Sequence, residues 1–481
     1  MRIKRQILRK TLTTNNKHIR PIQRKLFIAA VLSLTFIPAA AQRALNPFGN
    51  ALIPDMIADA SITLIDGTYY CYATTDGYGR GLETSGPPVV WKSEDFTNWR
   101  FDGIYFPSAA EQKYWAPSKA VSANGKYYIY PTINGYMYPA VADSPDGPFK
   151  LARGKDEFHL PYTSSTLLQG ENRYGIDTEI FIDDDGQAYA IWGGRQIAKL
   201  KSDMMTITGD IHTIETRRGG YSEGPILFKR NGIYYYLYTL GGDERYQYAY
   251  GMSRTSPLGP YTFPEQDIIT TTDYEAGVFG PGHGCVFTDD KGNYYIAYLE
   301  FGRRSTNRQT YVNRLEFNDD GTIRPVKLDL NGVGALKRIK GPKPLHVSRF
   351  ETSSVKAPEY IVPMKDTLCN RTEFFVPEFA GDMSNGSRWM AAPEDTEAWI
   401  MADLGSIKRI RKSEIYFVQP TAGHSYRMET SVDGKTWTAR GGHDDMQRRS
   451  PHTDTLTGIR ARYIRIAITG GTRGVWEWNI Y

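Results

Sequence analysis

The 481-residue chain is poor in cysteine. Its three cysteines, Cys71, Cys285 and Cys369, lie far apart and are odd in number, and no two of them have the spacing of a metal-binding motif. These features argue against a fold held by disulfides and against a cysteine-based zinc site. The chain is long enough for two or three domains, so we expect an apolar core to stabilise it.

The N-terminus lacks acidic residues. Residues 1–25 contain nine Lys and Arg and no Asp or Glu, and an apolar run, Leu26–Ile37, leads to Ala39-Ala40-Ala41. This run is shorter than the roughly 20 residues that a membrane-spanning helix needs. No cysteine stands at the predicted cleavage point to carry a lipid. Residues 1–41 are therefore predicted to be a signal peptide, which indicates a secreted or periplasmic protein.

The rest of the chain has no excess of positive charge. Without the leader, 49 Lys and Arg stand against 53 Asp and Glu, a net charge of about −4. This balance gives no electrostatic reason to expect nucleic acid or an anionic membrane as a partner. We expect a neutral partner instead.

Helical periodicity is nearly absent, and five aromatic-rich runs recur in its place, each starting at a glycine. Their spacings of about 46–61 residues leave room for four short strands, the size of one β-propeller blade. We therefore predict an all-β chain with a five-bladed β-propeller in residues 42–342; the alternative is a sandwich of unrelated hairpins. The runs are Gly67–Thr74, Gly125–Thr132, Gly186–Gly193, Gly232–Thr239 and Gly292–Leu299.

The composition of the sequence changes at Gly341. Two prolines and a Ser/Thr-rich stretch up to Val355 indicate a linker. Alternation of apolar and polar residues, with an Asp-Gly turn at Gly434, then predicts an antiparallel β-sandwich. We assign residues 343–481 to this linker and second domain.

Three acidic residues occupy matching places in the repeat. Asp59, Asp177 and Glu223 each precede the glycine of an aromatic-rich run by eight or nine residues. A propeller gathers the first strands of its blades around one axis, so these side chains are expected to converge there. Hydrolysis of a glycosidic bond requires two carboxyl groups, one to protonate the leaving oxygen and one to activate water or attack directly. A single acid in a loop is usually a solvated surface charge. Three acids at the same position of three repeats favour a catalytic role.

Five short motifs follow one another along the chain: Ala58–Ser61, Trp115–Pro117, Ile176–Phe181, Ser222–Pro225 and Gly280–Gly284. With these motifs in this order, the sequence resembles glycoside hydrolase family 43. The resemblance covers about 290 residues and implies a five-bladed propeller.

The resemblance implies a role for each acid. Asp59 is expected to be the general base, Glu223 the general acid, and Asp177 the residue that orients Glu223 and raises its pKa by like-charge repulsion. Asp55 is the reserve candidate for the base. Family members invert the anomeric configuration, so base and acid are expected about 6.5–9.5 Å apart.

Other positions suggest contacts with the sugar. Trp115 is expected either to stack on a sugar ring or to pack between blades. Arg308 resembles an arginine that contacts substrate in this family, and an exposed basic residue is the alternative. His283 is expected on the channel axis, either as a hydrogen-bonded structural residue or as a ligand, through water, of a structural calcium ion. No cofactor is expected to be required. Departures from the family motifs, at Ala60, Ser118 and Thr178, bear on the choice of sugar.

The C-terminal segment resembles the discoidin-like (factor V/VIII type C) sandwich and family 32 carbohydrate-binding modules. It is expected either to bind sugar or to buttress the propeller. The motifs that carry the likeness are Trp389, Ala402–Gly405, Ser431–Trp437 and Arg462–Arg465.

The family resemblance implies an exo-acting enzyme that removes terminal non-reducing sugars from a poly- or oligosaccharide. We expect α-L-arabinofuranose or β-D-xylose as the sugar, with β-D-galactofuranose as the alternative, and we expect Gly81–Pro88 to form a rim loop that closes the pocket. An alternative of another class is a sugar-binding propeller without catalytic activity, which is expected to have lost at least one of the three acids. All three acids are present.

Overall fold

The computed structural model describes residues 49–78, 85–106, 113–152, 166–168, 175–301, 307–338 and 341–481. All of them belong to one compact unit, Arg43–Tyr481. The predicted leader, residues 1–41, and residues 81–84 of the predicted rim loop lie outside the described residues. Within the described ranges, no helix is long and apolar enough to cross a membrane.

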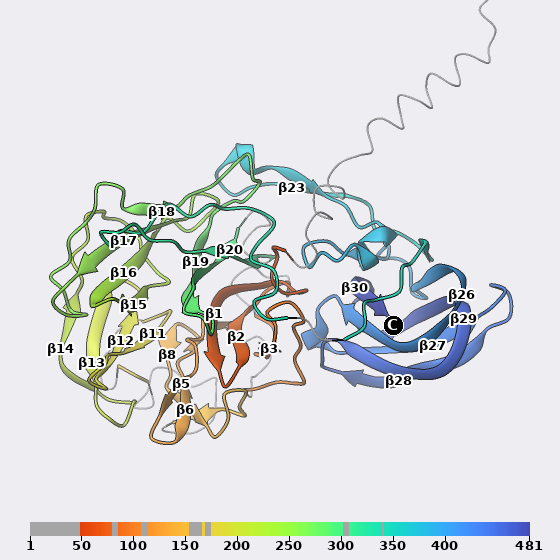
Figure 1. The fold of residues 1–481 in the computed structure, drawn as a ribbon, viewed down its shortest axis with the longest axis horizontal. Coiled ribbons are helices and arrows are strands. Elements are labelled where there is room, and N and C mark those ends of the chain that lie inside the picture. Colours follow the sequence, from red (N-terminus) through yellow and green to blue (C-terminus); the bar gives the residue numbers. More distant parts are fainter. Residues whose placement is uncertain are drawn as a thin grey trace, which may run out of the picture. The chain divides into compact units, whose positions relative to one another are not determined.

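Five antiparallel sheets follow one another along the chain and form the blades of a propeller (Figure 1). In each sheet the strands pair in chain order, and the first strands of neighbouring sheets contact one another: β1 with β19, β19 with β15, and β15 with β11. The expected all-β class is thereby confirmed. The sheets are β1 (Ile57–Ile65), β2 (Thr68–Thr75) and β3 (Val90–Ser93); β5 (Val121–Ala123), β6 (Lys126–Ile129), β9 (Ala140–Ala142) and β10 (Lys150–Leu151); β11 (Glu179–Ile182), β12 (Ala188–Trp192), β13 (Gln196–Leu200) and β14 (Ile207–Thr213); β15 (Ile226–Arg230), β16 (Ile233–Leu240), β17 (Gln247–Ser253) and β18 (Ile268–Thr270); β19 (Gly282–Thr288), β20 (Tyr294–Glu300) and β21 (Gln309–Arg314).

The five aromatic-rich runs form the second strand of each blade: β2, β6, β12, β16 and β20. The glycine that opens each run lies in the hairpin turn and has a φ between +70° and +84°. Side-chain-bearing residues adopt this conformation at a cost, which explains why glycine recurs there. A short extra sheet, β4 (Tyr114–Trp115), β7 (Thr132–Ile133) and β8 (Tyr136–Met137), belongs to the second repeat.

The segment before β1 pairs with the last blade. The Leu52 amide donates to the Thr310 carbonyl at 2.8 Å, and the side chain of Asn50 bonds both the amide and the carbonyl of Val312 at 2.8 and 3.1 Å. The beginning and the end of the propeller are thus joined by hydrogen bonds. This closure brings β21 beside the chain that leads into β1.

The C-terminal sandwich is built on two bent strands of 19 residues, β26 (Trp399–Phe417) and β29 (His452–Gly470), which pair with each other. Apolar side chains from these strands, with Trp389 and Trp478, fill its core. The other strands of this sheet are β22 (Arg349–Thr352), β25 (Trp389–Met390), β27 (His424–Ser431), β28 (Thr438–Gln447) and β30 (Gly474–Ile480).

The stretch predicted as a linker contains a strand. β22 pairs with β26, and the side chain of Phe350 enters the sandwich core. A hairpin, β23 (Glu359–Ile361) and β24 (Arg371–Glu373), follows, with the short 3-10 helices η2 (Thr367–Cys369) and η3 (Pro377–Gly381); a third, η4 (Pro420–Ala422), comes after β26. This strand was not predicted, because Phe350 is its one buried apolar residue and the surrounding prolines and serines are typical of a linker.

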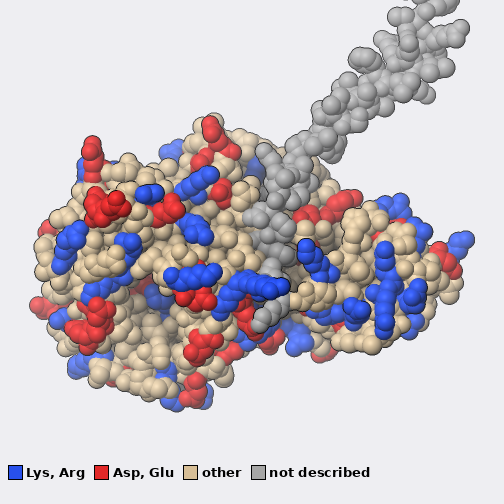
Figure 2. Space-filling view, viewed as in Figure 1, with Lys and Arg blue, Asp and Glu red and all other residues tan. Residues whose placement is uncertain are grey.

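Charge differs between the two domains on the face shown in Figure 2. Acidic and basic side chains are interspersed over the propeller, whereas basic side chains predominate over the sandwich, at the right of the view. The mixed charge of the propeller face agrees with the low net charge of the chain.

Candidate active site

Each blade carries one residue with a positive φ where its first strand begins. The five residues precede their hairpin glycines by eight or nine positions, so they are structural equivalents. Ladder irregularities at Ala58/Ser61 and Gly282/Gly284 accompany two of them, and such bulges redirect a side chain. Positive φ is costly for residues other than glycine and often marks functional sites. The five are Asp59 (φ 55°), Ala116 (33°), Asp177 (60°), Gly224 (51°) and His283 (40°).

The three acids predicted from the sequence converge with His283. His283 Nδ1 lies 3.2 Å from Asp59 Oδ1, and its Nε2 lies 3.9 Å from Asp177 Oδ2. The Gly224 amide, directly after Glu223, donates to Asp177 Oδ2 at 3.3 Å. In the fourth blade Gly224 has the positive φ that Asp59 and Asp177 have in theirs, and the acid, Glu223, lies one residue earlier.

Asp59 is buried and is surrounded by donors. Arg308 Nη1 and Nη2 donate to its two carboxylate oxygens at 3.0 and 3.2 Å, and Thr74 Oγ1 donates to Oδ2 at 2.7 Å. Burial by itself raises the pKa of Asp59, but the charges of Arg308 and His283 and the hydrogen bond from Thr74 outweigh it, so the pKa lies below its ordinary value. Asp59 is thus ionised and able to accept a proton.

Arg308 is buried between two carboxylates. Besides its bonds to Asp59, its Nε donates to Asp76 Oδ2 at 2.9 Å and its Nη2 to Asp76 Oδ1 at 3.1 Å. Its backbone amide also donates to Asp76 Oδ2, at 3.1 Å. Four of the five guanidinium N–H groups are thereby used within the protein. Arg308 was predicted from the sequence as a substrate contact, and the structure places it as the partner of Asp59. Asp76, which directly follows β2, was not identified from the sequence.

Asp177 and Glu223 have the opposite electrostatic character. Burial raises the pKa of Asp177 to about 7, and the negative charges of Glu223 and Asp59 add to this against the opposing charge of His283. Burial likewise raises the pKa of Glu223, with His283 and a hydrogen bond from Tyr221 acting against it. The site therefore holds one low-pKa carboxylate and two high-pKa carboxyl groups, the separation that acid–base catalysis uses.

The pKa of His283 is raised. Burial lowers it, but Asp59, Asp177 and Glu223 surround the ring and favour its charged form. Among the described residues, no group of three or more His, Cys, Asp and Glu is placed to hold a metal ion. Both ring nitrogens of His283 face carboxylates, an arrangement that does not fit direct metal ligation by this ring. Ligation through water stays a prediction.

Two aromatic residues are connected to this centre by hydrogen bonds of their own or of a neighbour. Trp115, on β4, is partly exposed and directly precedes Ala116, whose amide donates to Thr74 Oγ1 at 2.9 Å. Tyr221 is 61 % exposed and its hydroxyl donates to Glu223 Oε2. Tyr221 was not identified from the sequence. Ser118, by contrast, is buried and bonds backbone groups of its own blade.

Asp55, the reserve candidate for the base, has different surroundings. It is 1 % exposed, its Oδ1 accepts from the Met56 amide at 2.8 Å, and its Oδ2 has no hydrogen-bond partner among the described residues. Burial raises the pKa of Asp55 to about 7. A group that is neutral over much of the acidic range is a poorer base than Asp59.

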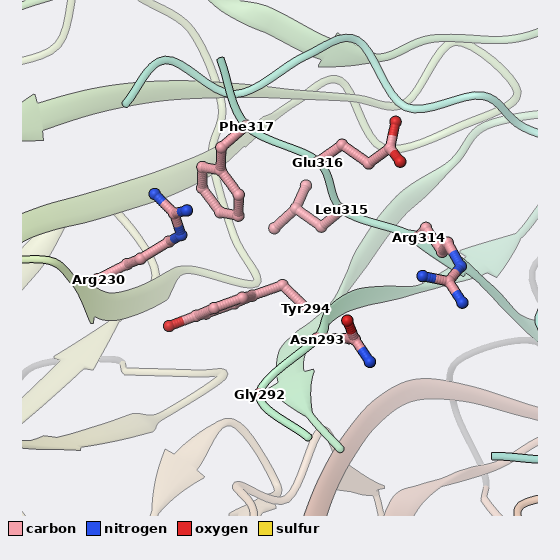
Figure 3. A pocket seen from close by; sticks show the side chains of 8 residues that line it. All are labelled: Arg230, Gly292, Asn293, Tyr294, Arg314, Leu315, Glu316 and Phe317. Atoms are coloured by element: carbon pink, nitrogen blue, oxygen red, sulfur yellow. The ribbon is translucent and has the colours of Figure 1, made fainter. Parts of the chain in front are cut away.

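A separate pocket of about 250 Å³ lies away from these acids (Figure 3). Arg230, Tyr294, Arg314 and Phe317 form much of its wall, and Gly292, the turn glycine after β19, lies at its edge. His283 lies at the other end of β19, and a seven-residue strand is roughly 23 Å long. Glu316 is the one carboxylate among the residues that line this pocket, so it lacks the pair that hydrolysis requires.

Two family models match the chain. The model described as glycosyl hydrolases family 43 matches residues 48–323, and the model described as F5/8 type C domain matches residues 366–480. A solved structure described as a glycoside hydrolase is 68% identical, covers 91% of this chain and 100% of its own, and has a TM-score of 0.88. An arabinoxylan arabinofuranohydrolase from Bacillus subtilis, solved with cellotetraose, is 20% identical with a TM-score of 0.52 over 91% of this chain and 99% of its own, and so agrees in fold.

Curated relatives differ in the sugar they are named for. A β-D-galactofuranosidase from Aspergillus niger is 32% identical over 313 residues, which are 59% of this chain and 86% of that protein. An arabinoxylan arabinofuranohydrolase from Paenibacillus polymyxa is 26% identical over 65% of this chain and 58% of its own length. A xylan 1,3-β-xylosidase from a Vibrio species is 27% identical over 54% of this chain and 51% of its own. The chain thus spans little more than half the length of the last two.

Proposed function

The chain belongs to glycosyl hydrolases family 43, and from that premise we propose that it is an inverting, exo-acting enzyme that removes terminal furanosyl residues from a polysaccharide or oligosaccharide. The observation that carries the proposal is the electrostatic division of the site. Asp59 is held ionised by Arg308 and Thr74, while the pKa values of Glu223 and Asp177 are raised by burial. A general base and a general acid are what hydrolysis requires. The alternative of a propeller without catalytic activity does not agree with the family and its glycosidase relatives.

The residues divide the reaction between them. Asp59 accepts a proton from a water molecule as the water oxygen bonds to the anomeric carbon. Glu223 donates its proton to the leaving oxygen as the glycosidic bond breaks. Asp177, which accepts from the Gly224 amide, holds the turn that carries Glu223 and repels its charged form. The products are a free sugar of inverted configuration and the shortened chain.

Two furanoses are the leading candidates for the terminal sugar. α-L-Arabinofuranose and β-D-galactofuranose have the same ring configuration and differ in the length of the exocyclic carbon chain. One relative is named for each of them. We place α-L-arabinofuranose first, on the names of two arabinoxylan arabinofuranohydrolases. β-D-Xylose stays an alternative, because two other relatives are named as β-xylosidases. β-D-Galactofuranose is second and is favoured by the relative of 32% identity.

The test compares the wild-type protein with Glu223→Gln on p-nitrophenyl α-L-arabinofuranoside, β-D-galactofuranoside and β-D-xyloside. We expect release from one furanoside and a loss of about 10²-fold or more in the variant, because the amide is not acidic enough to transfer a proton to the leaving oxygen. An activated leaving group needs less protonation, so the comparison is repeated on the natural oligosaccharide. Glu215→Gln, at an exposed position, is the matched control.

Three outcomes count against the proposal. Activity unchanged in Glu223→Gln contradicts the assignment of the acid. Release of xylose alone contradicts the furanoside preference. Proton NMR of the first product formed shows its anomeric configuration, and retention of configuration contradicts the inverting mechanism.

We also place the protein outside the cytoplasm. The support is the predicted leader in residues 1–41 and the name of one relative, an extracellular endo-α-(1→5)-L-arabinanase from Thermotoga petrophila. Signal-peptide cleavage is tested by N-terminal sequencing of the protein recovered from its native host. A mature N-terminus at or near residue 42 is expected.

A further inference from the structure

The C-terminal sandwich contacts the propeller at the chain segments that lead to the catalytic base. Met56, three residues before Asp59, is buried in a cluster with Tyr416, Val418 and Trp476 of the sandwich. The carbonyl of the same Met56 accepts from the Asp76 amide at 2.8 Å. Met56 therefore connects the sandwich to Asp76 through a hydrogen bond and to Asp59 through the chain, and these two carboxylates bind Arg308.

A second contact reaches the loop that follows Asp76. Gln419, at the end of β26, donates from Nε2 to the carbonyl of Gly77. The Gly77 carbonyl can only accept, so the amide nitrogen of Gln419 must face it, and the Gln419 Oε1 accepts from Thr472 Oγ1 on the other side. Gly77 itself has a φ of +91°, and a Cβ there would lie 3.1 Å from Met56 Sδ. The same Cβ would lie 3.5 Å from Gln419 Nε2, so the loop is also packed against the sandwich.

A third contact reaches the residue after Arg308. Gln309 is fully buried and donates from Nε2 to the Asn385 carbonyl at 3.1 Å. The side chain of Asn385 donates to the Leu52 carbonyl at 2.8 Å. The sandwich therefore holds each of the three propeller segments around Asp59: the chain before β1, the loop after β2 and the start of β21.

We propose that the sandwich positions the general base, and that Gln419 is a positioning residue that acts through Gly77 and Asp76 on Arg308 and Asp59. The path consists of direct contacts: Gln419 holds Gly77, Asp76 binds Arg308 with three hydrogen bonds, and Arg308 binds both oxygens of Asp59. A domain that binds only sugar has no need of buried contacts at these places. The inference rests on the proposed function, in which Asp59 activates water.

The test pairs two substitutions at one position. Gln419 has a φ of 54°, which glycine adopts freely and alanine does not. Gln419→Ala and Gln419→Gly both lose the amide, but the glycine variant is relieved of backbone strain and is expected to have the higher Tm. Ser413→Ala is the control for stability, because it removes a buried hydrogen bond from Trp478 within the sandwich, 2.8 Å long.

The activity readout separates positioning from stability. With folded protein well below Tm, we expect kcat to fall about tenfold equally in both Gln419 variants, with KM changed by less than about twofold, because small displacements of catalytic groups are costly. Ser413→Ala is expected to lose Tm and keep its kcat. A kcat that follows Tm across the three variants, or that does not change in the Gln419 variants, overturns the proposal.

A second readout does not depend on catalysis. Amide hydrogen exchange of the peptides that contain Met56 and Gly77 is expected to rise in both Gln419 variants and to stay at the wild-type level in Ser413→Ala. Unchanged exchange there overturns the inference even where the enzyme is active. If the wild-type protein releases no sugar while exchange rises as expected, the proposed function fails and the structural role of Gln419 stands.

Discussion

Arg308→Met tests the electrostatics of the site most directly. Methionine approximates the length of the arginine side chain but leaves Asp59 and Asp76 without their shared counter-charge. An opposite charge in contact with a carboxylate lowers its pKa by about 1–3 pH units. The acid limb of the kcat/KM profile, which reports the base of the free enzyme, is therefore expected to move to higher pH by about that amount. Each pH unit lowers kcat/KM about tenfold on that limb.

The same substitution has a consequence for stability, whose sign follows from the lowered pKa of Asp59. A carboxylate with a lowered folded-state pKa stabilises the fold above its unfolded pKa, and that contribution is lost as pH falls through the folded pKa. Breaking a buried ion pair by removing one partner costs about 3–5 kcal/mol at neutral pH. In Arg308→Met the two stranded carboxyl groups take up protons as pH falls, so the Tm difference from wild type is expected to shrink toward pH 4.

The assays are a pH profile of kcat/KM and thermal unfolding between pH 4 and 8. Arg254→Met, at an exposed position, is the control, and Arg308→Lys retains the charge but not the planar fork that binds two carboxylates. We expect the lysine variant to fall between wild type and methionine. An acid limb that does not move in Arg308→Met, together with a Tm difference that is independent of pH, refutes the reasoning.

Three further predictions concern other parts of the site. In Tyr221→Phe the hydrogen bond that lowers the pKa of Glu223 is lost, so the basic limb of the kcat profile should move to higher pH; a shift to lower pH contradicts this. In Gly224→Ala the new Cβ meets His283 Cδ2 at 2.5 Å and the φ of +51° becomes strained, so a loss of about 1–3 kcal/mol of unfolding free energy is expected in chemical denaturation. EDTA is expected to leave kcat unchanged; loss that calcium restores would instead support a calcium ion held near His283 through water.

Much of the fold could be predicted because it repeats locally. The turn glycines and the aromatic second strands lie within a few residues of each other, so their pattern is visible in the sequence. Asp59, Asp177 and Glu223 could be identified because each stands eight or nine residues before a turn glycine. The strand at Phe350 was missed because its pairing partner, β26, lies about 50 residues away and its own signal is one buried side chain.

The surroundings of the base could not be predicted in the same way. Asp76 and Arg308 are separated by 232 residues, and no spacing rule connects them. Their pairing depends on ring closure, which brings the end of β2 and the start of β21 together. The contact between Gln419 and Gly77 likewise depends on how two domains pack. Side chains that meet only after such packing leave no local pattern.

The closure of the ring has a consequence for the order in which the enzyme becomes competent during synthesis. Asp59 leaves the ribosome 249 residues before Arg308. At roughly 5–20 residues per second, this is a delay of about 10–50 seconds. Over that interval Asp59 of the nascent chain has no Arg308 to pair with. The segment before β1 likewise has no β21 to bond to, so the ring of blades is open. Competence is therefore expected only after the fifth blade has met the segment that precedes the first.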